Sequence, residues 1–122
     1  MITGRVTHNE GRIRLILKGH RGREQAIEAV IDTGFTAAMT LPRAAITALN
    51  LQWQGIERFT LADGTESIFD VYEAKVIWDG RVRSIVVLEA NAKPLIGMKL
   101  LRGHELKMQI HYRGNVTITR LP

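Results

Sequence analysis

The chain has 122 residues, of which 45% are hydrophobic and 24% charged, and it contains no cysteine. These values are typical of one soluble, globular domain over residues 1–122, and they exclude disulfides and thiolate metal sites. The formal net charge of +5 could attract nucleic acid. However, the basic residues are scattered and only 6% of the residues are aromatic, which favours solvated strand faces over a basic nucleic-acid-binding β-barrel.

Four short strands are predicted in the first third of the chain, at residues 2–9, 12–18, 24–32 and 38–41. The first two alternate loosely between apolar and polar residues and predict a β-hairpin, with Glu10-Gly11 as its turn. A second turn is expected from Gly19 to Gly22. The third strand becomes fully apolar as it approaches Asp32, which is typical of a strand that enters the core.

The one clear helix is predicted between Pro42 and Asn50. Proline suits the first helical position, Ile46 and Leu49 lie on one helical face, and Asn50 is expected to end the helix. Residues 51–55 are then expected to form a link in which Trp53 covers the edge of the core.

The second half of the chain predicts more strands and one short helical segment at residues 98–102. The strands are expected at residues 56–62, 65–78, 81–88, 105–112 and 115–121. The pairs Asp63-Gly64 and Asp79-Gly80 are strong hairpin signals, and Arg113-Gly114 is expected to turn the last hairpin. Many short strands separated by frequent turns predict a mainly β fold, either a small barrel or a sandwich.

The apolar residues before Asp32 lead directly into the sequence Asp32-Thr33-Gly34. A carboxylate where a strand leaves the core is costly unless it is paired, hydrogen-bonded or protonated. Active sites often keep carboxylates in such places, so Asp32 is a candidate catalytic residue. The rival interpretation is a plain strand-ending turn in which Asp32 binds nearby backbone.

Three motifs together resemble the retropepsin-like aspartic proteases. Val30-Ile31-Asp32-Thr33-Gly34 is similar to the active-site loop of that family, and Leu61-Ala62-Asp63-Gly64-Thr65 is similar to its flap tip. Pro94-Leu95-Ile96-Gly97-Met98 resembles the late apolar segment that precedes a short helix in the family. The motifs occur in the family order and span about residues 25 to 105, which is more specific than one Asp-Thr-Gly alone.

The resemblance implies a closed retropepsin-type β-barrel with one or two short helices, and an aspartic endopeptidase that uses no cofactor. Asp32 would be catalytic, and Thr33 and Gly34 would support the active-site loop. In the family, the matching threonine hydroxyls hydrogen-bond across a dimer axis. The mobile, substrate-binding flap tip would comprise Ala62, Asp63, Gly64 and Thr65, although Asp63-Gly64 could instead be an inert turn.

Aspartic proteolysis requires two carboxyls that share one proton, because like charges about 3 Å apart cannot both ionise. One carboxylate draws a proton from water, and the other carboxyl donates a hydrogen bond to the peptide carbonyl. This chain has one Asp-Thr-Gly, and Asp63, Asp70 and Asp79 lie in poor contexts for the partner role. The sequence therefore predicts a homodimer in which each subunit contributes one Asp32, with a peptide or protein as substrate.

Phe35 departs from the family pattern, in which Ala or Ser commonly follows Asp-Thr-Gly. A serine there can hydrogen-bond the outer carboxylate oxygen, whereas Phe35 cannot, and Thr36 or water would have to replace it. Loops with Phe at this position are similar to those of small bacterial members. The departure keeps open an alternative function, a catalytically weak or inactive retropepsin-fold module that binds peptides or mediates dimerisation.

Other classes of site and location receive little support from the sequence. The four histidines are dispersed and lack the spacing of metal ligands, so no metal site is expected. Ser67 and Ser84 lack an activating context for a nucleophile. We expect no signal peptide and no membrane-spanning segment, and therefore a cytoplasmic protein.

Overall fold

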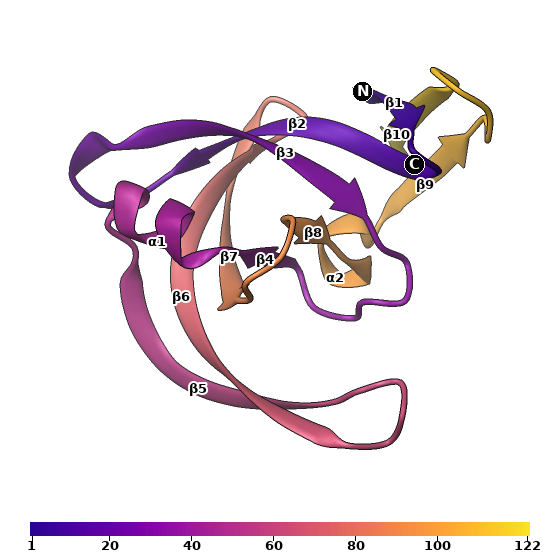
Figure 1. The fold of residues 1–122 in the computed structure, drawn as a ribbon. Coiled ribbons are helices and arrows are strands. Elements are labelled where there is room, and N and C mark those ends of the chain that lie inside the picture. Colours follow the sequence, from indigo (N-terminus) through magenta and orange to yellow (C-terminus); the bar gives the residue numbers. More distant parts are fainter.

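The computed structural model describes residues 1–122 and confirms a mainly β fold with two short α-helices (Figure 1). The first five strands are β1 (Ile2–Thr7), β2 (Glu10–Lys18), β3 (Glu24–Ile31), β4 (Met39–Leu41) and β5 (Gln52–Thr60). The others are β6 (Glu66–Trp78), β7 (Arg81–Glu89), β8 (Leu95–Ile96), β9 (His104–Met108) and β10 (Asn115–Arg120). The helices are α1 (Arg43–Leu49) and α2 (Met98–Leu101), with a 3-10 turn, η1, at His20–Gly22.

All the strands belong to one sheet, and six of them form a closed ring. The sheet order is β5-β6-β7-β4-β8-β3-β2-β1-β10-β9, and an additional pairing of β2 with β6 closes the ring. β2 makes this possible because the two halves of one edge have different partners: Glu10 to Ile13 pair with β1, and Ile16 to Lys18 pair with β6. The opposite edge of β2 pairs with β3 along most of its length.

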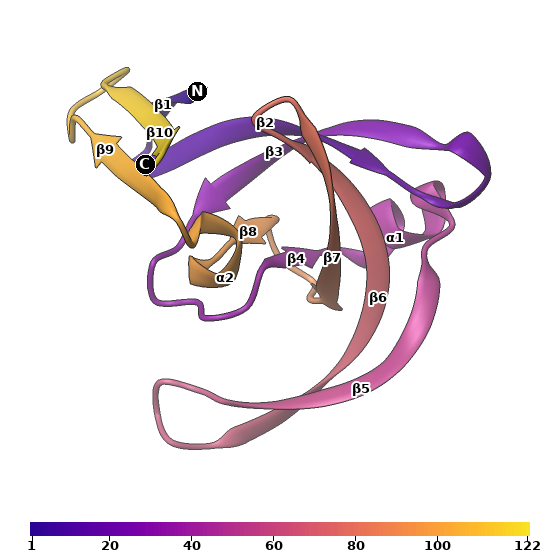
Figure 2. The ribbon, with the colours of Figure 1, turned by 180° about the vertical axis from the view of Figure 1, so that it is seen from behind.

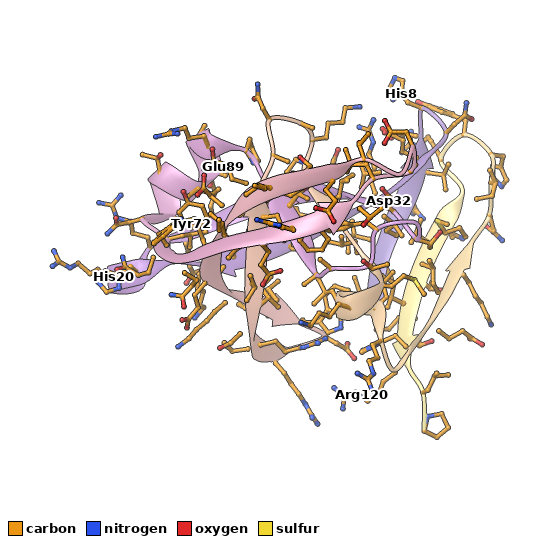
Figure 3. The ribbon with its side chains drawn as sticks, turned by 90° about the horizontal axis from the view of Figure 1, so that it is seen from below. His8, His20, Asp32, Tyr72, Glu89 and Arg120 are labelled. Carbon is orange, nitrogen blue, oxygen red and sulfur yellow. The ribbon has the colours of Figure 1, made fainter.

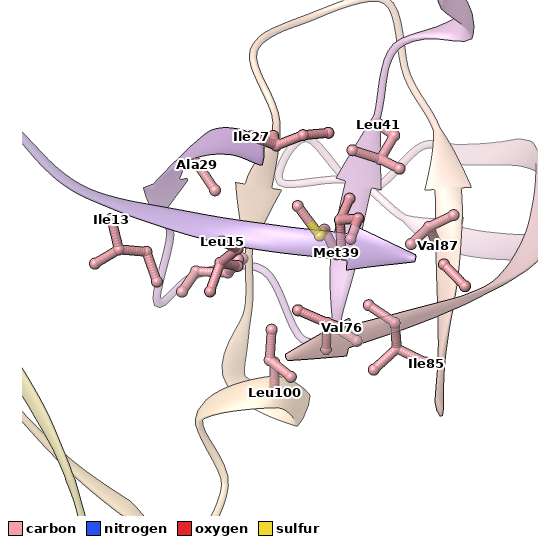
Figure 4. Close-up of a cluster of buried hydrophobic side chains, with 14 of the residues drawn as sticks. Ile13, Leu15, Ile27, Ala29, Met39, Leu41, Val76, Ile85, Val87 and Leu100 are labelled. Atoms are coloured by element: carbon pink, nitrogen blue, oxygen red, sulfur yellow. The ribbon is translucent and has the colours of Figure 1, made fainter. Parts of the chain in front are cut away.

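The interior of the ring is filled by alternate side chains of its strands. Along β2, Ile13, Leu15 and Leu17 are buried, while Arg14 and Ile16 point outward, as the two-residue period of a strand requires. Side chains from β3, β4, β6, β7 and α2 meet them in one cluster, shown in Figure 4. The sheet is therefore wrapped around a single hydrophobic core.

Two parts of the sheet extend beyond the ring. The β5–β6 hairpin curves away from it and ends in a free tip, visible at the bottom of Figures 1 and 2. On the other side, β1, β10 and β9 continue the sheet from β2, so both chain ends lie together there. The hairpin tip is joined to the ring only through its own two strands, since β5 pairs with β6 alone.

The predicted helix and two of the hairpin turns are confirmed with small shifts. α1 lies between Pro42 and Asn50, but Pro42 occupies the N-cap position rather than the first helical one. Asn50 ends the helix in a left-handed conformation, with φ 50°, which asparagine tolerates better than most residues. Asp63-Gly64 and Asp79-Gly80 turn the hairpins β5–β6 and β6–β7.

The first hairpin turns at His8-Asn9, so the prediction of Glu10-Gly11 is wrong. His8 and Asn9 have φ values of 53° and 60°, the double left-handed geometry of tight hairpin turns. The last hairpin also differs, because β9 ends at Met108. Its loop folds back onto β1, where Arg113 N–H donates to the Val6 carbonyl at 2.7 Å.

β5 begins at Gln52, within the segment that the sequence predicted as a link. A β-bulge between Trp53 and Gly55 shifts the register of β5 against β6 and bends the strand. Trp53 does not cover the core edge: it is 61% exposed, and its indole Nε1 donates to Asp70 Oδ1 at 3.0 Å. Neither helix is long and apolar enough to cross a membrane.

We predict that Leu17→Ala destabilises the protein by about 2–5 kcal/mol, because Leu17 is fully buried where β2 closes the ring against Val76. The matched control is Ile16→Ala, the next residue of the same strand, which is 40% exposed. Urea unfolding followed by circular dichroism measures both. Equal losses for the two variants would contradict the position of the core.

Candidate active site

Asp32 lies immediately after the end of β3, where the chain leaves the core. Val30 and Ile31 pair in parallel with Leu95 and Ile96 of β8. This pairing continues one residue further, since Asp32 N–H donates to the Ile96 carbonyl at 2.9 Å. The backbone of Asp32 is thus held by the sheet, while its side chain is half-buried at the sheet end.

The carboxylate of Asp32 accepts one hydrogen bond from within the chain. Gly34 N–H donates to Asp32 Oδ1 at 2.9 Å, and Phe35 N–H donates to the Asp32 carbonyl at 3.1 Å. These two bonds fold residues 32–35 into a tight turn and orient the carboxylate. Asp32 has no cationic partner among the ion pairs of the chain, so it is free to interact with groups outside the chain.

The loop from Phe35 to Ala38 is fastened to α2 by backbone hydrogen bonds. Gly97 N–H donates to the Ala38 carbonyl at 3.0 Å, and Met98 N–H donates to the Phe35 carbonyl at 2.8 Å. Gly97 permits this approach because it lacks a side chain: a Cβ there would lie 2.3 Å from the Ala37 carbonyl oxygen and 2.5 Å from that of Phe35. The Asp-Thr-Gly motif and the Ile96-Gly97 motif are therefore brought into direct contact.

Phe35 packs over Gly97 and does not point into solvent. Its ring carbon Cδ2 would lie 2.6 Å from a Cβ on Gly97, and Phe35 is half-buried. Neither Thr33 nor Thr36 hydrogen-bonds the Asp32 carboxylate within the chain, and both are exposed. The hydroxyl of Thr33 is thus available to a partner outside the chain.

The tip of the β5–β6 hairpin is a tight turn closed by Asp63. Leu61 N–H donates to the Thr65 carbonyl at 2.7 Å, and Asp63 Oδ1 accepts bonds from Thr65 Oγ1 at 2.6 Å and Thr65 N–H at 2.9 Å. The bond from the Thr65 hydroxyl, followed by that from its N–H, holds the pKa of Asp63 below its usual value. Gly64 has φ +84°, which glycine adopts without strain.

The hairpin tip and the Asp32 loop face the same region of space. The free end of the hairpin extends beneath the loop that follows β3 (Figure 1). In the view from below, the hairpin crosses the molecule in front of the region labelled Asp32 (Figure 3). Ala62, Asp63, Gly64 and Thr65 are all exposed, as are Leu61 at 44% and Ile68 at 57%.

A cavity of about 310 Å³ lies between the inner side of this hairpin, β7 and the loop that follows Asp32. Ala37, Ala38, Ile85, Val86 and Leu88 line its apolar part. Charged side chains border it at Glu57, Glu73, Arg83 and Lys99. Sequence reasoning did not assign these residues, because they come from five separated segments that only the closed ring brings together.

The other aspartates are engaged elsewhere in the chain. Asp63 binds Thr65 at the hairpin tip, Asp70 accepts the Trp53 indole N–H, and Asp79 binds the amine of Met1 in the β6–β7 turn. That amine holds the pKa of Asp79 below its usual value. The chain by itself thus presents Asp32 without a second aspartate beside it.

The remaining polar groups show no second reactive cluster. No group of three or more histidine or acidic side chains is placed to hold a metal ion. Tyr72 donates to Glu89 Oε1 at 3.1 Å, and burial, followed by this bond to Glu89, raises the pKa of Tyr72. This pair lies well away from Asp32 (Figure 3).

At the level of sequence, the chain matches no known protein-family profile and no curated protein. Among solved structures, it is similar to EIAV protease in complex with the inhibitor HBY-793, with a TM-score of 0.62 and 16% sequence identity. The similarity covers 80% of this chain and 92% of the protease chain. At this identity the likeness shows a shared fold.

We predict that Gly97→Ala disrupts the Asp32 loop, because its Cβ would clash with two backbone carbonyls. The expected loss of stability is about 1–3 kcal/mol, with large shifts of the amide NMR signals from Asp32 to Ala38. The control is Gly22→Ala, which meets no atom within 4 Å but has φ +73°. It should cost about 1–2 kcal/mol and leave those signals in place; unchanged loop signals in Gly97→Ala would contradict the contact.

We predict that Thr65→Ala raises the pKa of Asp63 toward its ordinary value of about 3.9, because the strongest bond to the carboxylate is lost. Since the pKa of Asp63 is lowered in the folded chain, its carboxylate supports the tip above the ordinary pKa, and this support is lost as pH falls through the lowered pKa. A carbon-detected NMR titration measures the change. Thr65→Ser, which keeps the hydroxyl, should leave the pKa low; an equal rise in both variants would refute the assignment.

Proposed function

We propose that the chain is a homodimeric aspartic endopeptidase of the retropepsin type, with residues 1–122 as one domain. In this proposal Asp32 is the catalytic residue, Thr33 and Gly34 support its loop, and the hairpin tip from Ala62 to Thr65 is the substrate-binding flap. The observation that carries the proposal is the half-buried Asp32 carboxylate at the end of β3, opposite a free hairpin tip, in a fold shared with EIAV protease.

The need for a second subunit follows from the chemistry. Hydrolysis by the aspartic-protease mechanism requires a carboxylate that accepts a proton from water and a carboxyl that donates a hydrogen bond to the peptide carbonyl. Because the other aspartates of the chain are engaged elsewhere, a second Asp32 is the natural partner. A two-fold axis beside the exposed Asp32 turn would bring the two copies together, since it pairs identical surfaces.

The neighbouring residues have roles that suit this arrangement. Gly34 N–H orients the Asp32 carboxylate through Oδ1, which leaves Oδ2 for a water or the partner carboxyl. The exposed Thr33 hydroxyl has no partner within the chain and would bind across the axis. The Asp32 loop is held by β8 and α2, and such support keeps a catalytic group in position without cost at the moment of reaction.

The substrate would be an extended peptide between the hairpin and the Asp32 loop. Extended peptides bind by backbone hydrogen bonds to strand-like segments, with side chains in alternate pockets. The cavity beside Ala37 and Val86, about 310 Å³ in volume, is of a size that accepts one side chain. Closure of the flap over the peptide would exclude water and strengthen the polar interactions beneath it.

A second candidate function is a peptide-binding or dimerisation module with weak or no catalysis. Phe35 favours it, because Phe35 supplies no hydrogen bond to the outer oxygen of Asp32, as a serine at this position could. In such a module the flap and cavity would still hold an extended peptide. Binding of a pepstatin-like inhibitor without turnover of any peptide between pH 3 and 8 would favour this candidate over the enzyme.

We predict that Asp32→Asn lowers peptide cleavage by at least about 100-fold, because asparagine can neither accept the proton from water nor share one with its partner. The fold should persist, since the asparagine oxygen can still accept the Gly34 N–H. Asp79→Asn is the matched control, because the same change lies in a turn remote from Asp32. Peptide-library cleavage by mass spectrometry measures the activity, and retained cleavage in Asp32→Asn would refute the assignment.

Mixing the Asp32→Asn variant with the unaltered chain distinguishes an active site shared by two subunits from one that a single chain carries. With a ninefold excess of Asp32→Asn over the unaltered chain, random dimers reduce activity per unaltered chain about tenfold. If one chain carried the whole site, activity per unaltered chain would not change.

A further inference from the structure

A second recess lies at the start of β7, and its lining is strongly basic. It has a volume of about 450 Å³. Its walls come from the end of β6, the start of β7, the turn between α2 and β9, and the end of β10. Four arginines line it, Arg81, Arg83, Arg102 and Arg120.

Three of these arginines stand on strand faces that elsewhere point into the core. Along β7, Ile85 and Val87 are buried, and the same face continues to Arg83 and Arg81. Along β10, the buried face of Val116 and Ile118 continues to Arg120. The recess is therefore the end of the core, where charged residues replace apolar ones on three inward positions.

The floor of the recess is Trp78, which is 1% exposed. Its indole Nε1 donates to His104 Nε2 at 3.2 Å, and His104 Nδ1 lies 3.0 Å from the Arg102 carbonyl. Because Nε2 accepts and a carbonyl can only accept, His104 carries its proton on Nδ1. His104 thus links the Trp78 indole to the Arg102 carbonyl, and its ring meets Trp78 edge-on.

None of the four guanidinium groups belongs to an ion pair of the chain. Arg83 Nη1 donates to the Leu100 carbonyl at 3.1 Å, which anchors it. Two acids lie close by in the chain, but both have other partners: Asp79 binds the Met1 amine, and Glu105 pairs with Lys107 at 3.5 Å. The charge of Arg120 also helps to lower the pKa of Asp79, after the Met1 amine. The recess therefore concentrates four guanidinium groups, none of which forms an ion pair within the chain.

We propose that this recess binds a compact ligand with several phosphate groups, such as an inorganic polyphosphate or a nucleoside triphosphate. Guanidinium groups bind phosphate oxygens in a fork geometry, and several of them around one hollow suit a short, multiply charged chain. An extended nucleic acid fits less well, because the arginines gather around one recess and Trp78 is too buried for a base to stack on it. Arg83 lines both this recess and the cavity beside the Asp32 loop, but in Figure 3 Arg120, on the far side of the recess, lies well away from Asp32.

The test is titration of the intact protein with tripolyphosphate and with ATP at low salt, by calorimetry and by NMR. Both ligands should bind once per chain and shift the indole N–H signal of Trp78. The chain has two tryptophans, and the signal of Trp53, which binds Asp70 on the hairpin, serves as the internal control. Tighter binding of ATP assigns a role to the nucleoside, and equal binding assigns the recess to the phosphate chain alone; both support the proposal.

The variant for this site is Arg81→Gln with Arg120→Gln, which keeps long side chains over Trp78 and spares the Arg83 anchor. It should weaken binding at least tenfold. The matched control, Arg14→Gln with Arg21→Gln, removes the same charge from exposed residues outside the recess and should weaken it less than twofold. Four outcomes would overturn the proposal. They are equal losses of affinity in the two variants, a shift of the Trp53 indole signal instead of the Trp78 signal, no binding at low salt, and tighter binding of an RNA oligonucleotide than of tripolyphosphate.

Discussion

The attachment of the Asp32 loop to β8 and α2 is the constraint on which the rest of the candidate site depends. Asp32 N–H donates to the Ile96 carbonyl, and at the next residue, Gly97, the missing side chain lets the loop carbonyls approach. Backbone bonds of this kind hold the loop in position because they fix its backbone torsions directly. A carboxylate fixed in this way can orient water or a second carboxyl.

The closed ring explains how such a short chain supplies both a packed base and a hairpin that projects from it. Pairing of β2 with β6 closes the core behind the Asp32 loop, while β5 and the outer half of β6 remain outside it. Burial stabilises the ring, whereas the residues of the hairpin tip are exposed. At Trp78, one end of the core borders a recess, where arginines take the place of apolar residues on the inward faces of the strands.

Phe35 is where the structure changes the interpretation of a residue most. In sequence it is a departure that removes a hydrogen bond from the candidate active site. In the fold it packs against Gly97 and so contributes to the contact that holds the loop. A residue with this structural role need not impair catalysis, because the Asp32 carboxylate already has an orienting bond from Gly34 N–H.

The sequence by itself determined the features that depend on neighbouring residues. The apolar run into Asp32, the hairpin turns at Asp-Gly pairs and the helix that ends at Asn50 all follow from local backbone preferences and periodicity. Only the tertiary structure decided which segments meet: the bulge that starts β5 early, the loop after β9 that folds onto β1, the contact of Gly97 with Phe35, and the arginine recess. These depend on pairing between distant strands, and no short window of sequence encodes such pairing.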